Sequence, residues 1–323
     1  MGDSCGNTIS YCELHVRHSD IPRQSRLQGD TGFCYRWSNA STSYFGDYNP
    51  VQHQETRMGK GRCTVVREDQ NEPMNDIDAA ISSLQQARRL GDTIPSPSLP
   101  DAHAAYAVQA GVAKALGWFG NAAPLHWKSG GASRSAPQTH APLPPAGVWS
   151  SPASAGKWPF HLRGIEAEVA LRLGVSVDAG LAATLDETAS RECIDAMCVA
   201  IEVVDSRWSE GLSAPPLAKL ADLQSHGALV LGPWVRFSQR NWSAQSGQVR
   251  IGTQSLHEFR GSHSMGDPSF VLLAWLRHGT RNGEVLAAGS VVTTGSWCGM
   301  LQAQAGDEVL AEFEGIGTAR VTL

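Results

Sequence analysis

The chain has 323 residues, 41% of them hydrophobic and 18% charged, which suits one or two ordinary domains with a sizeable core. Its 26 basic and 31 acidic residues give a formal net charge of −5, so the chain lacks the excess of positive charge that is typical of proteins that bind nucleic acids or anionic membranes. The lack of a long apolar stretch, of a signal-like N-terminus and of framework cysteine spacing predicts a reduced, cytoplasmic protein without a membrane span.

The first 73 residues differ in character from the rest of the chain. They show no sustained helical or strand periodicity of apolar residues, although four of the seven cysteines lie there. Two interpretations stay open for residues 1–73: a disordered tail, or an extension of the gene model with Met74 as the real start. We expect residues 74–323 to form the catalytic domain.

From residue 74 onward the apolar pattern predicts two helices followed mostly by strands. Apolar residues recur at helical spacing over residues 77–91 and 101–116. A long loop is expected over residues 133–160, and a late helix over residues 268–278. Strands are expected in seven segments, namely residues 126–128, 165–173, 197–204, 227–232, 248–259, 285–294 and 308–321. This order of elements predicts an α+β fold.

Glu166 and Glu168 form the strongest local chemical feature. Residues two apart in a strand point to the same side, so both carboxylates project from one face of the sheet. Two like charges at that distance repel each other unless something neutralises them, and a divalent cation with hard oxygen ligands does so. On spacing alone, a solvated edge strand with an ordinary polar face is the simpler interpretation.

Glu202 stands alone inside the apolar run of residues 197–204. A buried carboxylate is costly unless it is paired or ligated, so Glu202 needs a partner. A third metal ligand is the economical interpretation. A salt bridge to Arg207 or Arg172 is the alternative.

A family resemblance rests on several segments that follow one another in a fixed order. The two segments around the glutamates read GIEAEVALRLG and AIEVVDSRW. The others are WKSG at 127–130, DLQSHGALVLG at 222–232, LAWL at 273–276, TGSW at 294–297 and AGD at 305–307. Together they resemble the fumarylacetoacetate hydrolase superfamily, and most closely its 2-keto-4-pentenoate hydratase and 4-oxalocrotonate decarboxylase branch. The resemblance covers residues 74–323.

The resemblance implies a fold, a cofactor and a ligand class. The fold would be a fumarylacetoacetase C-terminal-like mixed β-roll with N-terminal helices, holding one Mg²⁺ or Mn²⁺ on Glu166, Glu168 and Glu202. Substrates of the family are small 2-keto acids, whose 1-carboxylate and 2-oxo oxygen chelate the ion. The ion acts as a Lewis acid and stabilises the enolate. A homo-oligomer is also expected.

The resemblance also assigns roles to five other residues. Lys128 stands at the position of the family's active-site lysine, where it would bind the substrate carboxylate, or shuttle a proton if burial lowers its pKa. Ser296 and Asp222 fall where substrate is bound, and Asp205 and Arg207 where groups behind the metal orient its ligands. The residues alone leave simpler interpretations open: a surface lysine, a turn serine and strand-end caps.

The sequence departs from the hydratase branch at the place of a general base. That branch usually carries an acidic residue after the lysine, directly before a glycine, whereas residues 142–147 read PLPPAG. Leu223 also replaces a frequent asparagine, and Cys298 a common threonine. We therefore predict a divalent-metal lyase for small 2-keto acids, hydratase-like in its reaction. The alternatives are a catalytically impaired keto-acid-binding member, or a decarboxylase or C–C hydrolase of the same superfamily.

Overall fold

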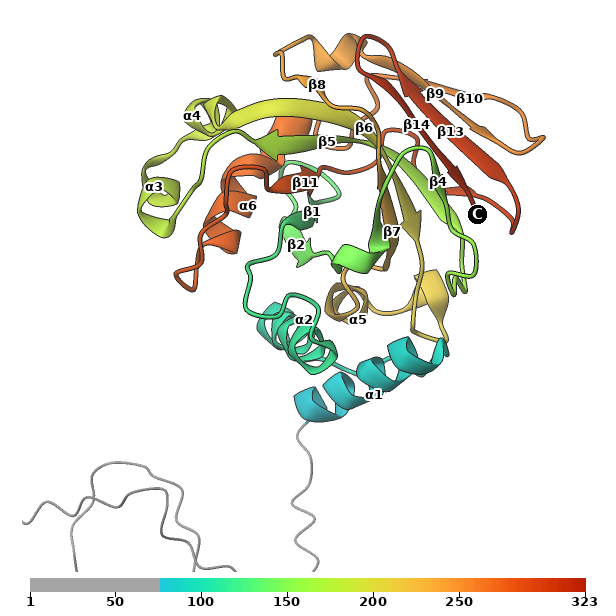
Figure 1. The fold of residues 1–323 in the computed structure, drawn as a ribbon. Helices are drawn as coiled ribbons and strands as arrows, with labels where there is room; N and C mark the ends of the chain where they lie inside the picture. The colour runs from blue at the N-terminus through green and yellow to red at the C-terminus, as the bar shows by residue number, and fades with distance from the viewer. Residues whose placement is uncertain (1–75) are drawn as a thin grey trace, which may run out of the picture. The chain divides into compact units, whose positions relative to one another are not determined.

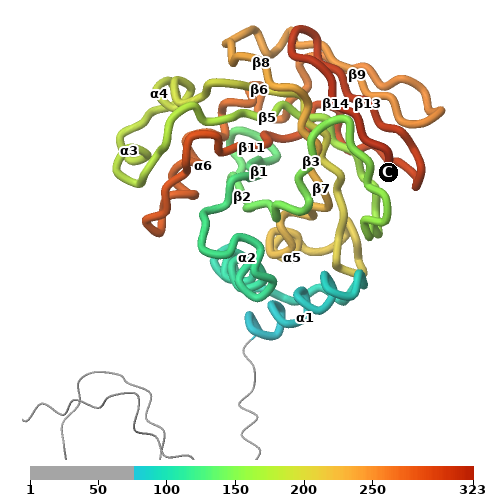
Figure 2. The backbone as a smooth tube through the Cα atoms, viewed as in Figure 1, coloured from blue at the N-terminus to red at the C-terminus, as the bar shows by residue number. Residues whose placement is uncertain are grey.

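The computed structural model describes residues 76–323, so the predictions for residues 1–73 fall outside the described part of the chain. In that part, two curved sheets share a core and a group of helices lies beside the larger sheet (Figures 1 and 2). This mixture of sheets and helices confirms the predicted α+β class. Among the described residues, no helix has the length and apolarity that crossing a membrane requires.

Helices α1 (Asp76–Leu90) and α2 (Ala102–Leu116) confirm the two predicted N-terminal helices. Asp101 caps α2, because its carboxylate accepts the backbone N–H of the third residue beyond it. The two helices pack closely at Gly111 of α2, where an added Cβ would lie 2.2 Å from Ile81 Cδ1 of α1. The short helix α5 (Pro216–Ala221) packs on α2, and the three helices bury a small apolar cluster of their own.

The larger sheet has nine strands, and its main path runs β2-β1-β11-β5-β6-β7-β3, with β12 beside β5 and β8 beside β6. Its centre is the long antiparallel pair β5 and β6, whose apolar runs are buried. The bounds of its strands are β1 (His126–Gly130), β2 (Thr139–Pro142), β3 (Val148–Ser150), β5 (Gly164–Leu173), β6 (Ile194–Val204), β7 (His226–Leu231), β8 (Val235–Arg236), β11 (Val291–Thr293) and β12 (Leu301–Gln302).

The smaller sheet has five strands in the order β10-β9-β13-β14-β4. Its inner face packs on β6 of the larger sheet, so that Val309 and Phe313 share one hydrophobic core with Val199 and Ile201. The bounds of its strands are β4 (Ala153–Ser154), β9 (Ser246–Ile251), β10 (His257–Arg260), β13 (Glu308–Phe313) and β14 (Gly317–Thr322).

Alternation along β5 and β6 decides where the polar side chains go. Odd-numbered residues from Ile165 to Leu173 of β5 and from Met197 to Val203 of β6 lie in the core between the two sheets. Even-numbered residues, such as Ala170 and Ala200, lie in a smaller cluster on the opposite face. The predicted division of residues 165–173 into two faces is therefore confirmed.

The boundaries of several predicted elements were wrong. The expected loop over residues 133–160 contains the short strands β2, β3 and β4, which pair with distant strands and carry no periodicity of their own. Residues 248–259 and 308–321 are each two strands joined by a turn. Within residues 285–294 only the last part, β11, is a strand.

The remaining helices are short. The predicted late helix is confirmed as a 3₁₀ turn followed by an α-helix, with Asp267 accepting from the backbone N–H of Ser269. Helices α3 and α4, capped by Asp178 and Asp186, were not predicted because one and a half turns show no apolar period. The bounds are α3 (Ala179–Thr184), α4 (Glu187–Glu192), α6 (Leu272–Gly279), η1 (Pro145–Gly147), η2 (Gly211–Ser213), η3 (Trp242–Ala244) and η4 (Pro268–Val271).

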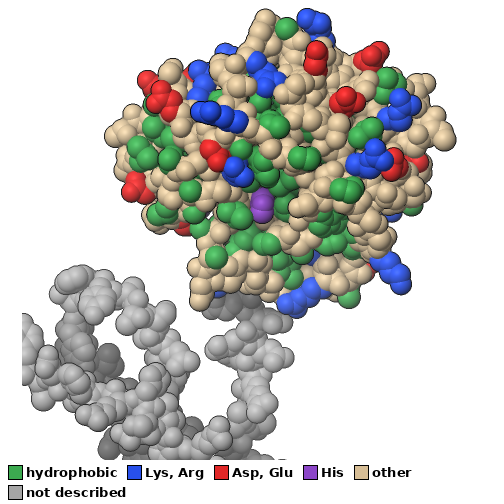
Figure 3. All heavy atoms as spheres, turned by 45° about the horizontal axis from the view of Figure 1, so that its top comes forward, with side chains coloured by type: hydrophobic (Ala, Val, Ile, Leu, Met, Phe, Trp, Pro, Cys, Tyr) green, Lys and Arg blue, Asp and Glu red, His purple; other side chains and the backbone are tan. Residues whose placement is uncertain are grey.

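The surface agrees with the small net charge of the chain. On the face shown in Figure 3, acidic and basic side chains are interspersed among apolar and polar ones. That face of the described part carries no extended basic area of the kind that binds nucleic acid.

Candidate metal centre

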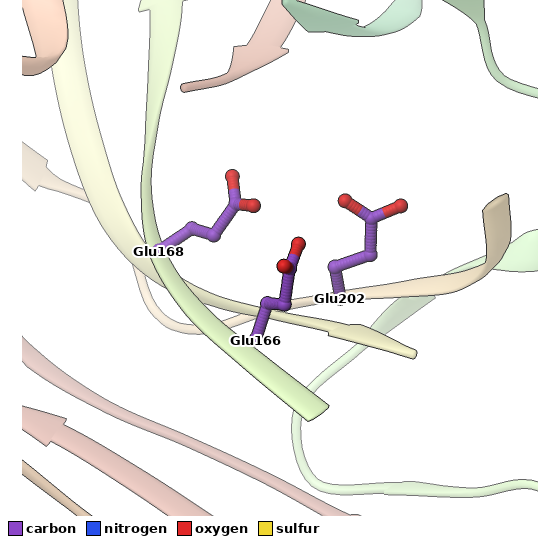
Figure 4. Close-up of side chains that lie close together, drawn as sticks. All are labelled: Glu166, Glu168 and Glu202. Carbon is purple, nitrogen blue, oxygen red and sulfur yellow. The ribbon is translucent and has the colours of Figure 1, made fainter. Parts of the chain in front are cut away.

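Three glutamates from the two central strands converge on one point. Glu166 and Glu168 lie two residues apart on β5, and Glu202 of β6 stands directly opposite Glu166 in the strand register. One carboxylate oxygen from each lies within 4.8 Å of the others, and Figure 4 shows all three side chains on the same side of the strands. Glu168 and Glu202 are buried, and Glu166 is half-buried.

The carboxylate of Glu168 is held in place from β11 and the turn after it. The hydroxyl of Thr293 and the backbone N–H of Gly295, the latter at 2.8 Å, both donate to Glu168 Oε2. Such hydrogen bonds fix the orientation of a metal ligand. Sequence reasoning missed Thr293, because its contact with Glu168 arises only when β11 pairs with β5.

The partner of Glu202 is Lys128 of β1, whose Nζ lies 2.5 Å from Glu202 Oε1. The alternative salt bridges to Arg207 and Arg172 were wrong, because those guanidinium groups pair with aspartates instead. Lys128 is the predicted active-site lysine, and the structure brings it to the three glutamates as expected.

The pKa of Lys128 bears on the two roles that the resemblance gives this residue. Burial opposes its charged form, but the carboxylates of Glu202, Glu166 and Glu168 outweigh burial and raise the pKa of Lys128 above its usual value. A lowered pKa was the condition for a proton shuttle, and the structure does not meet it. Lys128 stays an ammonium ion, which in turn helps to lower the pKa of Glu202 despite its complete burial.

The other two carboxyls are hard to ionise without a cation. Burial and the charges of the neighbouring glutamates raise the pKa of Glu166 to about 8. Burial and Glu202 likewise raise the pKa of Glu168 to about 7, against the hydrogen bond from Thr293. Like charges held this close in a buried place are typical of a site that a cation completes.

These raised pKa values predict how the stability of the metal-free protein depends on pH. Between pH 7 and 8 the folded protein keeps protons on Glu166 and Glu168 that the unfolded chain has already released, so these two groups make stability fall as pH rises. Buried histidines with lowered pKa values act in the opposite direction at lower pH, where the unfolded chain protonates them, and their effect fades above pH 7. In chelator we expect a melting temperature several degrees lower at pH 8 than at pH 7, and no such decrease with MgCl₂. An unchanged melting temperature in chelator would contradict the assigned burial of charge.

The donor set fits a hard divalent cation. Carboxylate oxygens suit Mg²⁺, Mn²⁺ or Ca²⁺. The second oxygen of Glu202, Oε2, is buried and has no hydrogen-bond partner among the described residues. An unpartnered buried carboxylate oxygen is costly, and a bound cation would satisfy it.

A strained turn after α5 holds a backbone carbonyl within hydrogen-bond distance of Lys128. Leu223, Gln224 and Ser225 have φ values of 55°, 55° and 60°, a left-handed conformation that costs non-glycine residues about 1–2 kcal/mol each. The carbonyl oxygen of Gln224 accepts from Lys128 Nζ at 3.1 Å. Strain of this kind is concentrated at functional sites. Sequence reasoning missed the turn, because no glycine or asparagine marks it.

His226, at the start of β7, is a further residue that sequence reasoning missed. Its Nδ1 lies 3.4 Å from Glu202 Oε1, whereas its Nε2 is buried without a partner among the described residues. The ring is 2% exposed. No spacing signal marks His226, because it meets Glu202 only through the pairing of β6 with β7.

Asp222, Asp205 and Arg207 form a buried ionic cluster with Arg88 of α1. Asp222 accepts from Arg207 Nε at 2.8 Å and from Arg88 Nη2 at 2.7 Å, so its carboxylate is engaged within the protein. Arg207 also donates to Asp205 and to the backbone carbonyl of His226. The cluster supports the start of β7, and the predicted substrate contact of Asp222 stays a prediction.

Ser296 lies in the segment that follows β11 and contacts Glu168. Its hydroxyl donates to the carbonyl of Gly299 at 2.5 Å, and Cys298 Sγ accepts the backbone N–H of Ala167 at 3.3 Å. Ser296 is half-buried and directly follows Gly295, whose N–H holds Glu168. It is thus near the glutamates, and its substrate contact stays a prediction.

This arrangement defines a class of α+β protein in which a curved mixed sheet presents three carboxylates and a lysine as a candidate divalent-cation site. The family model described as fumarylacetoacetate (FAA) hydrolase C-terminal matches residues 116–323. The chain belongs to the fumarylacetoacetate hydrolase family, and the resemblance seen in the sequence is confirmed.

Solved structures with a similar fold include two of 4-oxalocrotonate decarboxylase from Pseudomonas putida G7. The one complexed with magnesium and adipate has a TM-score of 0.65 and 17% identity, and the match covers 76% of this chain and 96% of that one. The one complexed with calcium and acetate has a TM-score of 0.63 and 16% identity over the same shares. At these identities the likeness shows the fold alone.

Proposed function

We propose that this chain is a divalent-metal enzyme that acts on small 2-keto acids through an enolate. The observation that carries the proposal is the convergence of Glu166, Glu168 and Glu202, with a buried oxygen left unpartnered, in a member of this family. These three residues would hold Mg²⁺ or Mn²⁺. When bound, the ion supplies a Lewis acid that stabilises negative charge on the 2-oxo oxygen of the substrate.

Lys128 is proposed to act electrostatically. Its pKa is raised, so it remains a cation and is a poor proton donor or acceptor near neutral pH. A fixed positive charge beside the glutamates attracts the substrate carboxylate and stabilises charge that develops on oxygen during reaction. Thr293 and Gly295 would keep Glu168 oriented through the cycle.

Hydration is the first reaction to test, and one observation favours a different candidate. Adding water to a double bond needs a group that directs the water, and Ala146 stands where the hydratase branch has an acid. The short helix η1 therefore offers no carboxylate. The second candidate is a family member that binds a keto acid without turning it over.

Turnover of 2-hydroxypenta-2,4-dienoate, followed by loss of its ultraviolet absorbance with Mg²⁺ or Mn²⁺, tests the proposal. Consumption that EDTA abolishes supports the hydratase. A panel with 4-oxalocrotonate and an acylpyruvate tests the decarboxylase and C–C hydrolase reactions of the superfamily under the same conditions. Bound metal and bound keto acid without turnover across the panel support the second candidate. Absence of metal binding rejects both.

A further inference from the structure

A peptide unit just beyond the end of β11 supports Glu168. The pairing of β11 with β5 ends at Thr293, so the next peptide unit, between Thr294 and Gly295, has no partner in this strand ladder. Its N–H donates to Glu168 Oε2 at 2.8 Å, and its C=O accepts from Nε2 of His263 at 2.9 Å. One planar peptide unit therefore stands between the glutamate and the histidine.

This peptide unit can rotate unless something holds it. Rotation of a planar peptide unit changes only ψ of the residue before it and φ of the residue after it. The residue after it is Gly295, at a φ of 108°, and glycine lacks the Cβ that would restrict this angle. The hydroxyl of Thr294 donates to the carbonyl of Val169 at 2.7 Å, which fixes the side chain but not the peptide unit. A rotated unit would turn its N–H away from Glu168.

His263 is arranged to donate to the carbonyl of this unit. The residue lies in the loop of residues 261–266, is 5% exposed, and its ring centre lies 5.3 Å from that of Trp297. Its Nδ1 accepts the backbone N–H of Met265 at 3.3 Å, so the hydrogen of the neutral ring is on Nε2, which faces Thr294. Burial lowers the pKa of His263 to about 4, so the ring is neutral near pH 7.

The loop that carries His263 is anchored on both sides of the ring. The hydroxyl of Ser262 donates to the carbonyl of Trp297, and that of Ser264 donates to the carbonyl of Gly131 at 3.2 Å. These two bonds limit the movement of the loop, so that Nε2 of His263 is a fixed donor.

We propose that His263 is a positioning residue of the metal centre: its hydrogen bond to the carbonyl of Thr294 fixes the peptide unit whose N–H orients the carboxylate of Glu168. A peptide unit whose carbonyl accepts a hydrogen bond is polarised, which makes its N–H a better donor. The inference rests on the proposed function in one respect, since it takes Glu168 to be a metal ligand. Loss of a group that supports a metal ligand costs about 10- to 100-fold in metal affinity, and His263 acts through one intervening peptide unit, so a loss of about 10-fold is expected.

Two variants of His263 separate its two hydrogen bonds. His263→Gln can place an N–H where Nε2 lies and keeps the bond to Thr294, whereas His263→Asn reaches only the position of Nδ1 and keeps the contact with Met265. Both variants are polar and each retains one bond, so their effects on stability should be similar. Calorimetric titration of the metal-free full chain with Mn²⁺, at a temperature where both are folded, should show binding about 10-fold weaker in His263→Asn and close to wild type in His263→Gln.

Ser264→Ala is the matched control for these variants. Its hydroxyl is exposed and belongs to the same loop, but its bond ends on Gly131 and not on the peptide unit that holds Glu168. The Mn²⁺ affinity of Ser264→Ala should equal that of the wild type. Undiminished affinity in His263→Asn, or equal losses in the two His263 variants, would overturn the inference, because the donor on Nε2 would then not matter.

Hydrogen exchange of the Gly295 amide in the metal-free protein separates this inference from the proposed function. The bond to Glu168 protects this amide, so NMR should show it exchanging several-fold faster in His263→Asn than in His263→Gln. Faster exchange together with a wild type that binds no Mn²⁺ would support the role of His263 and reject the proposed function. Equal exchange rates in the two variants, with Mn²⁺ bound by the wild type, would overturn the inference while the proposed function stands. Equal rates and no Mn²⁺ binding would reject both.

The wild type supplies a test that does not require a variant to fold. NMR of the chain with ¹⁵N-labelled histidine should show the ring of His263 in its neutral form with the hydrogen on Nε2 near pH 7. A hydrogen on Nδ1 alone would leave Nε2 unable to donate to Thr294, and that result would overturn the inference.

Discussion

Replacing Glu168 by glutamine is expected to lower the affinity for Mn²⁺ at least about 100-fold, because loss of a supporting group alone costs metal sites about 10- to 100-fold and a direct ligand contributes more. Glutamine keeps the shape of the side chain and can still accept from Thr293 and Gly295. The fold should therefore survive. Calorimetric titration with Mn²⁺ measures the affinity, and the activity should fall with it.

The same variant has a second expected effect, of opposite sign, on the metal-free protein. Glu168 is buried among like charges and its pKa is raised to about 7, so at pH 8 its ionised form destabilises the fold. A neutral glutamine removes that repulsion, and the melting temperature in chelator should rise. Glu258→Gln, on the exposed part of β10, is the matched control and should change neither quantity. Undiminished Mn²⁺ affinity in Glu168→Gln would reject its assignment as a ligand.

Alternation along strands made two properties of the glutamates predictable. Glu166 and Glu168 share a face wherever their strand forms, and Glu202 needs a partner because it is a charge inside an apolar run. The central strands were also predictable, since β5 and β6 are long enough to show their periodicity. These inferences use only the residues within one strand, whereas the meeting of Glu202 with the other two glutamates depends on the pairing of β5 with β6, which only the family resemblance implied.

What the sequence did not reveal depends on pairing between distant strands. Lys128 was expected at the site, but its pairing with Glu202 was not, because the distance between β1 and β6 follows from β11 and β5 lying between them. The contact from Thr293 and the position of His226 arise in the same way. Short strands such as those in residues 133–160 form for the same reason, since their stability comes from their neighbours.

Electrostatics was the least predictable property. From the sequence, Lys128 had two possible roles, binding the substrate carboxylate or, if burial lowered its pKa, shuttling a proton. In the structure three carboxylates surround the ammonium group and reverse the sign of the shift. The change moves the proposed role of Lys128 from proton transfer to charge stabilisation, which gives a distinct experimental expectation.

Lys128→Met is expected to lower kcat about 100- to 1,000-fold, the usual effect of removing one group that stabilises developing charge. Metal binding should persist, because all three glutamates remain. If Lys128 stabilises charge, its titration should contribute little to the pH dependence of kcat of the wild type between pH 6 and 9. If Lys128 shuttles a proton, its titration should appear in that pH profile. Lys157→Met, at an exposed lysine, is the control and should keep full activity.

The melting temperature of Lys128→Met gives a second test, because a purely catalytic role of Lys128 would leave it unchanged. Without the ammonium group, Glu202 is a fully buried carboxylate that has lost its nearest cation, and breaking such a pair costs about 3–5 kcal/mol. The metal-free variant should therefore melt well below the wild type, and MgCl₂ should recover most of the difference, since the cation replaces the lost positive charge. A variant as stable as the wild type in chelator would show that Lys128 and Glu202 do not depend on each other. Destabilisation that MgCl₂ leaves unchanged would show that the cation binds away from Glu202.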